Sequence, residues 1–147
     1  MPAAHMQTDP GVPPDKQPAL RVTAMPADTN PYGDVFGGWL MAQMDLAGGL
    51  AAARRVRGRA VTVAADGMSF LRPVSVGDEL SIYADIVALG RTSMRIKVQA
   101  WRRARDAELA EKVTEAVFTF VAVDSEKRPT PIPGLAPAAL TASATVA

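Results

Sequence analysis

The stretch GGWLMAQMDLAGGLAAA, residues 37–53, decides the fold. It is rich in Leu, Met and Ala and poor in β-branched residues, a composition that favours a helix. The arginine-rich segment that follows, residues 54–59, predicts the solvated end of this helix, since positive charge is favourable near a helix C-terminus. The predicted helix is apolar nearly all round, and such a helix must be buried on several sides.

Downstream of this helix the hydrophobic period changes to two. Apolar Met94, Ile96 and Val98 alternate with Arg95 and Lys97, which is the pattern of a half-buried strand. The predicted strands are long, roughly 10–12 residues where the average is nearer 5–6. A single long antiparallel sheet that curves around the helix would bury it, which gives an α+β architecture of one helix and about five strands. The expected strands are Leu20–Ala24, Ala60–Phe70, Asp78–Leu89, Ser93–Arg103 and Lys112–Val123.

Prolines mark the ends of this core. Seven of the 12 prolines precede residue 32 and four follow residue 128, and proline is disfavoured in helix interiors and central strands. The sequence therefore predicts a disordered or loosely packed arm at 1–18, one domain at 19–128, and a flexible Pro- and Ala-rich tail at 129–147. The arm lacks the apolar run of a secretory signal, and no segment is apolar over the length of a membrane span. We therefore expect a soluble, cytoplasmic protein with no membrane partner.

Composition argues against several kinds of site. The chain has 16 Lys and Arg against 15 Asp and Glu, and this balance argues against a general nucleic-acid binder. It has no cysteine and a single histidine, His5 in the arm. Thiolate catalysis, a Ser-His-Asp triad and a metal site built on Cys or His are therefore not expected. An enzyme with this sequence would rely on carboxylates, backbone dipoles and bound water, with no metal and no cofactor.

Asp45 is the only charged residue between Gly37 and Ala53. A buried carboxylate is costly unless it has a partner or a purpose. One interpretation is structural: the carboxylate is hydrogen-bonded to a hydroxyl of a neighbouring strand, such as that of Thr62. The other is catalytic, because desolvation would raise the pKa of Asp45 and make it a better base than an exposed aspartate. Spacing alone leaves both interpretations open.

The entry to the helix, TNPYGDVFGGW at residues 29–39, is the second unusual feature. A helix that begins with two glycines presents unpaired backbone N–H groups, which can polarise a carbonyl as an oxyanion hole does. Gly37 and Gly38 are equally compatible with close helix–sheet packing or with an ordinary turn.

Several ordered blocks of the sequence resemble a known family. They are AMPADTNPYGDVFGGWLMAQMDLAGG (24–49), VTVAADGMSFLRPVSVGD (61–78), GRTSM (90–94) and TEAVFTFVAVD (114–124). Together they strongly resemble the acyl-CoA thioesterases of the hotdog fold, in particular the small bacterial single-domain acyl-CoA thioester hydrolases. The resemblance covers roughly Leu20 to Pro133. It implies a long central helix wrapped by a curved antiparallel sheet, and hydrolysis of acyl-CoA to a free carboxylic acid and CoA.

The resemblance also implies roles for matching residues. The mid-helix acid, Asp45, would be the catalytic carboxylate, and an Asp or Asn shortly before the Gly-Gly pair, here Asp34, would contribute to the site. The amides near Gly38 would meet the thioester carbonyl. CoA, as part of the substrate rather than a cofactor, would contact the strand after the helix and the T-S-M block, which places these contacts at Val63, Ala64, Ala65, Thr92, Ser93 and Met94.

Arginines are the candidates for binding the CoA phosphates, because a guanidinium can bind phosphate through two hydrogen bonds. For the arginines of residues 54–59, which follow the predicted helix, the other interpretation is a solvated helix end. The candidates are Arg54, Arg55, Arg57, Arg59 and Arg91.

The implied reaction leaves two mechanisms open. Asp45 either activates a water as general base or attacks the carbonyl directly and forms a mixed anhydride. Two other functions could use the same fold. A non-catalytic acyl-CoA sensor or carrier would be favoured by loss of the helix carboxylate, which is present here. A dehydratase or isomerase commonly uses an Asp–His pair, and the core has no histidine.

Assembly is the last expectation. Family members form dimers and often trimers of dimers, so the resemblance implies a homohexamer. Gly37 and Asp45 lie eight residues apart, roughly 12 Å along a helix, so one thioester carbon cannot contact both within one chain. Two antiparallel helices across a twofold axis would place Asp45 of one chain beside the helix start and Asp34 of the other. Trp101, which stands among charged residues on its strand, is the candidate for an intersubunit contact.

Overall fold

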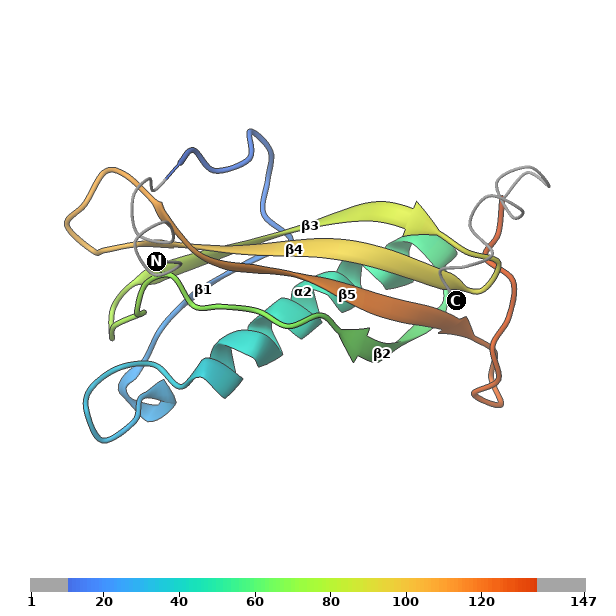
Figure 1. Ribbon diagram of the computed structural model, residues 1–147, viewed down its shortest axis with the longest axis horizontal. Helices are drawn as coiled ribbons and strands as arrows, with labels where there is room; N and C mark the ends of the chain where they lie inside the picture. The colour runs from blue at the N-terminus through green and yellow to red at the C-terminus, as the bar shows by residue number, and fades with distance from the viewer. Residues whose placement is uncertain (1–10, 135–147) are drawn as a thin grey trace.

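The computed structural model, which describes residues 11–134, places one long helix against one face of a five-stranded antiparallel sheet (Figure 1). The strands lie in the order β1-β3-β4-β5-β2. The predicted hotdog-type α+β architecture is therefore confirmed. The elements along the chain are β1 (Leu20–Thr23), a short 3-10 turn η1 (Pro26–Asp28), α2 (Gly37–Val56), β2 (Arg59–Ala65), β3 (Glu79–Leu89), β4 (Ser93–Arg103) and β5 (Glu111–Val123).

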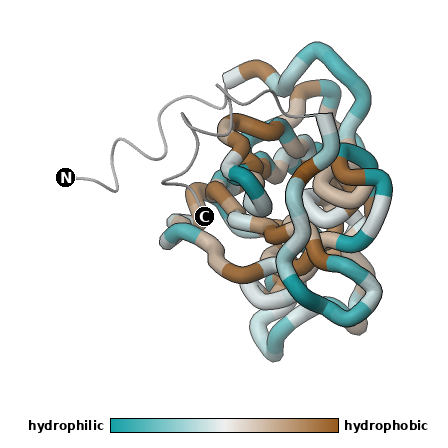
Figure 2. The backbone as a smooth tube through the Cα atoms, turned by 90° about the vertical axis from the view of Figure 1, so that its right-hand side faces the viewer, coloured by the Kyte–Doolittle hydropathy of each residue, from teal (hydrophilic) through white to brown (hydrophobic). Residues whose placement is uncertain are grey.

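The sheet buries its helix-facing side through period-two alternation. In β4 the side chains of Met94, Ile96, Val98 and Ala100 are fully buried, as the sequence predicts. β5 lies between β4 and β2, and therefore is an inner strand, which agrees with its apolar residues on both faces. Viewed along the strands, the hydrophilic turns lie mainly at the outside of the molecule (Figure 2).

One face of α2 packs on this sheet. Its buried residues recur every three or four positions: Leu40, Met44, Ala47, Gly48, Ala52 and Val56. At Gly48 the helix approaches the sheet so closely that an added Cβ would lie 2.8 Å from the ring of Phe120. Glycine is therefore required there by packing. The helix ends at Val56, and the next residue, Arg57, has a positive φ of 52° that turns the chain toward β2.

The opposite face of α2 is not covered, which differs from the expected burial on several sides. Leu46 is 57% exposed, Leu50 is 52% exposed, and Met41 also remains accessible. The sheet curves, but within one chain it reaches only one side of the helix (Figure 1). The apolar composition of the remaining face therefore has no explanation inside the described part of the chain.

β2 is shorter than predicted and lies at the edge of the sheet. It ends at Ala65 rather than Phe70, and its pairing with β5 is interrupted by a bulge between Thr62 and Ala64. The segment after Ala65 stays beside β5 through isolated contacts, including a hydrogen bond from the Leu71 N–H to the Val113 carbonyl. One side of β2 has no neighbouring strand among the described residues.

Two terminal segments lie against the sheet. Near the N-terminus, Lys16 forms an ion pair with Asp85 of β3, and Gly11 approaches the ring of Trp101. Near the C-terminus, Ile132 is buried and its N–H donates to the Arg91 carbonyl. The remainder of the predicted arm and tail, residues 1–10 and 135–147, lies outside the described residues.

Trp101 does not form the exposed surface that its sequence neighbours suggest. Its side chain is 4% exposed, and its Nε1 donates to Oε1 of Gln99 at 2.9 Å. The chain itself covers the ring, so Trp101 offers little surface for the expected intersubunit contact. Among the helices of residues 11–134, none combines the length and the apolar character needed to cross a membrane.

Candidate functional site

Asp45 lies where α2 passes over β2. The hydroxyl of Thr62 donates a hydrogen bond to Oδ1 of Asp45, with an oxygen–oxygen distance of 2.5 Å. Its second carboxylate oxygen, Oδ2, has no hydrogen-bond partner among residues 11–134. The partner expected from a structural interpretation is thus present, but it satisfies only one of the two oxygens. A carboxylate held at one oxygen and free at the other can accept a proton.

The burial expected for Asp45 is only partly provided by this chain. The residue is half-buried, and it lies on the same helix as the uncovered Leu46 and Leu50. The side chains of Val61 and Val63 on neighbouring β2 are also exposed. An apolar surface of this kind, next to an unpaired strand edge, is typical of an interface rather than of a monomer surface.

The start of α2 offers free backbone donors. The first hydrogen bond of helical type runs from the Leu40 N–H to the Phe36 carbonyl at 3.2 Å. The N–H groups of Gly37, Gly38 and Trp39 have no acceptor within the described part of the chain, and Gly37 and Gly38 are exposed. These donors lie at the positive end of the helix dipole, where they can stabilise a developing negative charge on oxygen.

The loop before α2 is organised by Asn30, which the sequence indicates as a turn residue but not as a site residue. Oδ1 of Asn30 accepts hydrogen bonds from the N–H groups of Tyr32 and Asp34, at 2.9 and 3.1 Å. The backbone N–H of Asn30 donates to the Asp34 carbonyl at 2.7 Å. Asp34 itself is exposed, and its carboxylate has no partner among residues 11–134. The Asn-Pro pair at 30–31 was the signal in the sequence, since asparagine commonly bonds to the backbone of its own turn.

The two groups of residues expected to contact CoA lie apart. Val63, Ala64 and Ala65 are exposed on β2, directly after Thr62. Thr92, Ser93 and Met94 are buried at the start of β4, and β5 separates them from β2. The hydroxyl of Ser93 is buried without a hydrogen-bond partner. Within one chain, only the β2 group is accessible beside Asp45.

The candidate arginines differ in their partners. Arg55 donates to the Pro133 carbonyl at 2.8 Å and Arg59 to the Ser125 carbonyl at 3.3 Å. The guanidinium groups of Arg54, Arg57 and Arg91 have no partner among residues 11–134.

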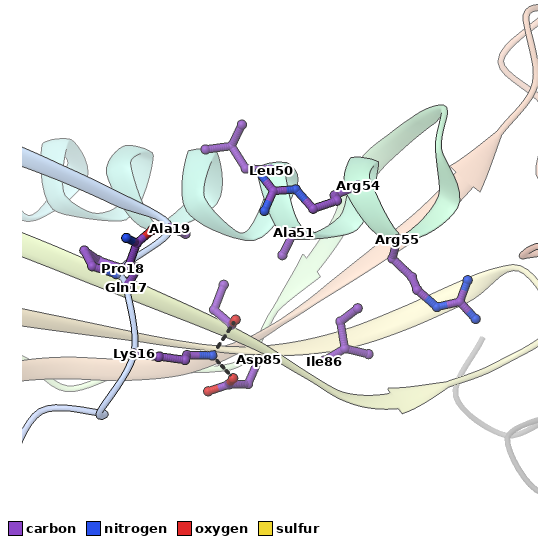
Figure 3. Close-up of a pocket in the computed structure, with 11 residues that line it drawn as sticks. Lys16, Gln17, Pro18, Ala19, Leu50, Ala51, Arg54, Arg55, Asp85 and Ile86 are labelled. Atoms are coloured by element: carbon purple, nitrogen blue, oxygen red, sulfur yellow. Dashed lines mark hydrogen bonds and ion pairs between the residues drawn. The ribbon is translucent and has the colours of Figure 1, made fainter.

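Two of these arginines, Arg54 and Arg55, line a cavity of about 600 Å³. It lies between the C-terminal half of α2 and β3, where Lys16 reaches Asp85 and Leu50 lies above (Figure 3). β3 and β2 are on different sides of the sheet centre, so this cavity is separate from the Asp45 carboxylate of the same chain. The described residues contain no cluster of His, Asp or Glu suited to hold a metal ion.

Residues 32–108 match the thioesterase superfamily. The chain belongs to this superfamily. An uncharacterized acyl-CoA thioester hydrolase of Zymomonas mobilis is 54% identical over 120 residues, which cover 82% of this chain and 80% of the relative. The acyl-CoA thioester hydrolase YciA of Escherichia coli is 49% identical over 117 residues, with coverage of 78% and 89%. A hexameric thioesterase from Yersinia pestis has a TM-score of 0.78 at 46% identity, covering 83% of this chain and 99% of that structure.

Membership of the thioesterase superfamily confirms the family expected from the sequence blocks. A further similar structure is of interest for Asn30. An acyl-CoA hydrolase from Staphylococcus aureus, 30% identical with TM-scores of 0.71–0.72 and covering 80% of this chain and 70–72% of that one, has been solved with an asparagine or an aspartate replaced by alanine. The two replaced positions are fifteen residues apart, as are Asn30 and Asp45 here.

Proposed function

We propose that this thioesterase-superfamily protein hydrolyses acyl-CoA to a carboxylic acid and CoA, with Asp45 as its catalytic carboxylate. The observation that carries the proposal is the state of this carboxylate: Thr62 holds Oδ1, while Oδ2 is free to accept a proton. The names of the relatives, which are acyl-CoA thioester hydrolases, support the substrate class.

In the proposed mechanism, a thioester carbonyl oxygen accepts hydrogen bonds from the free N–H groups at Gly38 and its neighbours. Oδ2 of Asp45 takes a proton from a water molecule as the water oxygen bonds to the carbonyl carbon. Collapse of the tetrahedral intermediate breaks the carbon–sulfur bond. The thiolate of CoA leaves and takes up a proton, and the carboxylic acid is released. Thiolate is a good leaving group, so the reaction needs no metal ion for this step.

Release of free thiol tests the activity. The purified protein is mixed with a panel of acyl-CoAs, from short to long and including branched and aromatic acyl groups, and free CoA is followed with a colorimetric thiol reagent. We expect release from at least part of the panel. No release from any acyl-CoA would exclude hydrolysis and would favour a binding protein.

We further propose that each active site is shared by two chains. Asp45 and the start of α2 are eight residues apart on one helix, roughly 12 Å, so one chain cannot bring both to a thioester carbon. The uncovered face of α2 and the free edge of β2 support an isologous dimer, in which Asp45 of one chain meets the helix start, Asn30 and Asp34 of the other. Val63, Ala64 and Ala65 would then lie at the interface, near the CoA thiol.

A charge in the uncovered face of α2 tests this dimer. We expect Leu46→Asp to convert the assembly into smaller particles and to remove most hydrolysis, because an unpaired buried charge costs about 3–5 kcal/mol, or roughly 10²–10⁴ in the dissociation constant. Light scattering measures the mass. Leu109→Asp, at an exposed apolar residue in the loop between β4 and β5, is the matched control and should change neither mass nor rate. An unchanged mass for Leu46→Asp would contradict the proposed interface.

For the whole assembly we propose a trimer of dimers in the cytoplasm, supported by the hexameric state in the name of the Yersinia pestis relative. For the chemistry we propose that no metal or other cofactor takes part. Dialysis against a strong chelator is therefore expected to leave kcat unchanged, with the metal content measured before and after. A loss of activity that added metal restores would contradict a mechanism that depends on Asp45 and backbone donors alone.

A further inference from the structure

A small cavity of about 160 Å³ adjoins the first turn of α2. Its apolar lining comes from the end of the loop before the helix, the helix itself, and the segment between β2 and β3. Leu40 and Val74 form buried walls, at 2% and 4% exposure. Phe36 and Phe70 also line it and are 49% and 43% exposed. Two half-exposed phenyl rings beside buried aliphatic side chains form an apolar surface that the described chain leaves uncovered.

The only charged residue that lines this cavity is already paired. Arg72 has an 11% exposed side chain, which donates to the Lys112 carbonyl at 2.8 Å and lies 3.5 Å from a carboxylate oxygen of Glu111. The charge of Arg72 is therefore balanced by groups of β5, and the surface that lines the cavity is mainly hydrocarbon. This chemistry favours an uncharged aliphatic or aromatic group over a phosphate or a carboxylate.

The cavity reaches the backbone of the helix start. Gly37 lines it, and a Cβ added at Gly37 would lie 3.4 Å from Cζ of Phe70. The Phe70 ring therefore lies against the same turn whose N–H groups are free. A chain bonded to a carbonyl at those N–H groups therefore begins beside the cavity, because Gly37 belongs to both.

We propose that this cavity binds the acyl chain of the substrate and that Phe70 sets its length limit. The inference rests on the proposed function, which places the thioester carbonyl at the helix start. A cavity of about 150 Å³ lined by Leu, Ile and Phe accommodates benzene, so this cavity accommodates about six carbons. The substrates that fill it are acyl-CoAs with short-to-medium aliphatic chains or one aromatic ring. Longer chains pass the two phenyl rings and gain little further contact.

The chain-length profile of kcat/KM tests the inference. Straight-chain acyl-CoAs from acetyl to dodecanoyl are the substrates, and free thiol is the readout. For the unaltered protein we expect kcat/KM to rise by about fourfold per methylene, the value for burying one CH₂, and to level off near six carbons. Phe70→Ala removes the ring that limits the chain length, so the ratio of kcat/KM for decanoyl-CoA to that for hexanoyl-CoA should increase about tenfold or more. Phe70→Trp narrows the cavity, so the plateau should be reached at fewer carbons and the ratio of hexanoyl-CoA to butanoyl-CoA should fall about fourfold or more.

Opposite shifts from two variants at one position separate a length limit from general damage, since a destabilised site would lower all rates together. Phe70 is half-exposed, so both variants are expected to fold, which circular dichroism verifies. Val87→Ala, at an exposed apolar residue of β3 far from this cavity, is the matched control and should leave the profile unchanged. Hydrolysis with the same profile in all four proteins would overturn the length limit while leaving the proposed function intact. No hydrolysis by the unaltered protein would overturn both.

Discussion

Asp45→Asn is expected to lower kcat by at least about 10², the lower end of the range for loss of a general base. Asparagine keeps the shape of the side chain and an oxygen that can accept the hydrogen bond from Thr62. It replaces the free Oδ2 by an amide nitrogen, which cannot accept a proton. The variant should therefore fold and assemble normally while losing the chemical step. Steady-state thiol release at saturating acyl-CoA measures kcat, and single-turnover kinetics with the enzyme in excess measure the chemical step independently of CoA release.

Thr62→Val is the comparison that distinguishes proton transfer by Asp45 from the positioning of Asp45 by Thr62. It removes the hydroxyl that holds Oδ1 but leaves the carboxylate in place, so its loss in kcat should be clearly smaller than that of Asp45→Asn. A folded Asp45→Asn protein with near-normal kcat would show that the carboxylate is a structural group, held by Thr62 as the first interpretation of the sequence allows.

The secondary structure was predictable because local patterns determine it. The composition of residues 37–53 indicates a helix, and the alternation of apolar and polar residues in 93–103 indicates a strand with one apolar face. Both elements begin where expected. The sequence places the end of β2 too late, because Met68 and Phe70 alternate with Ser69 as in a strand, whereas in the structure regular pairing with β5 has a bulge between Thr62 and Ala64 and ends before Asp66-Gly67.

Burial was harder to predict than secondary structure. The apolar residues of α2 are predicted to be buried, but a sequence does not say whether the covering surface belongs to the same chain. Leu46 and Leu50 are exposed on the uncovered face of α2, and in the proposed dimer the partner chain buries them. Trp101 shows the reverse error: its charged neighbours suggested exposure, while the segment around Gly11, distant in the sequence, covers it.

For the candidate site, the sequence identified the residues with unusual chemistry but not those that position them by ordinary contacts. Asp45 is conspicuous because it is charged in an apolar helix, and its hydrogen bond with Thr62 is one of the two interpretations that the sequence offers. Asn30 is an unremarkable turn residue until its Oδ1 is seen to hold two backbone N–H groups. The length-limiting role proposed for Phe70 likewise depends on a contact with Gly37 across 33 residues of sequence.

Mixing two inactive variants tests whether the site is shared, and is expected to restore about a quarter of the unaltered activity. Asp34→Ala damages the half-site at the helix start, and Asp45→Ala damages the half-site in the middle of the helix. When equal amounts are unfolded and refolded together, half of the dimers are mixed. Each mixed dimer then holds one doubly damaged site and one intact site, because the two substitutions lie on different chains.

Each variant refolded alone is the control and should remain inactive. If Asp34→Ala retains activity, Asn30→Asp takes its place, since it keeps the Oδ1 that organises the loop and replaces the amide donor by a negatively charged carboxylate oxygen. A site built within one chain gives a different result. Every chain in the mixture then carries one damaged site, no pairing repairs it, and the activity stays at the level of the separate variants. Recovery to about a quarter therefore requires that Asp45 act on a thioester held by the helix start of the partner chain.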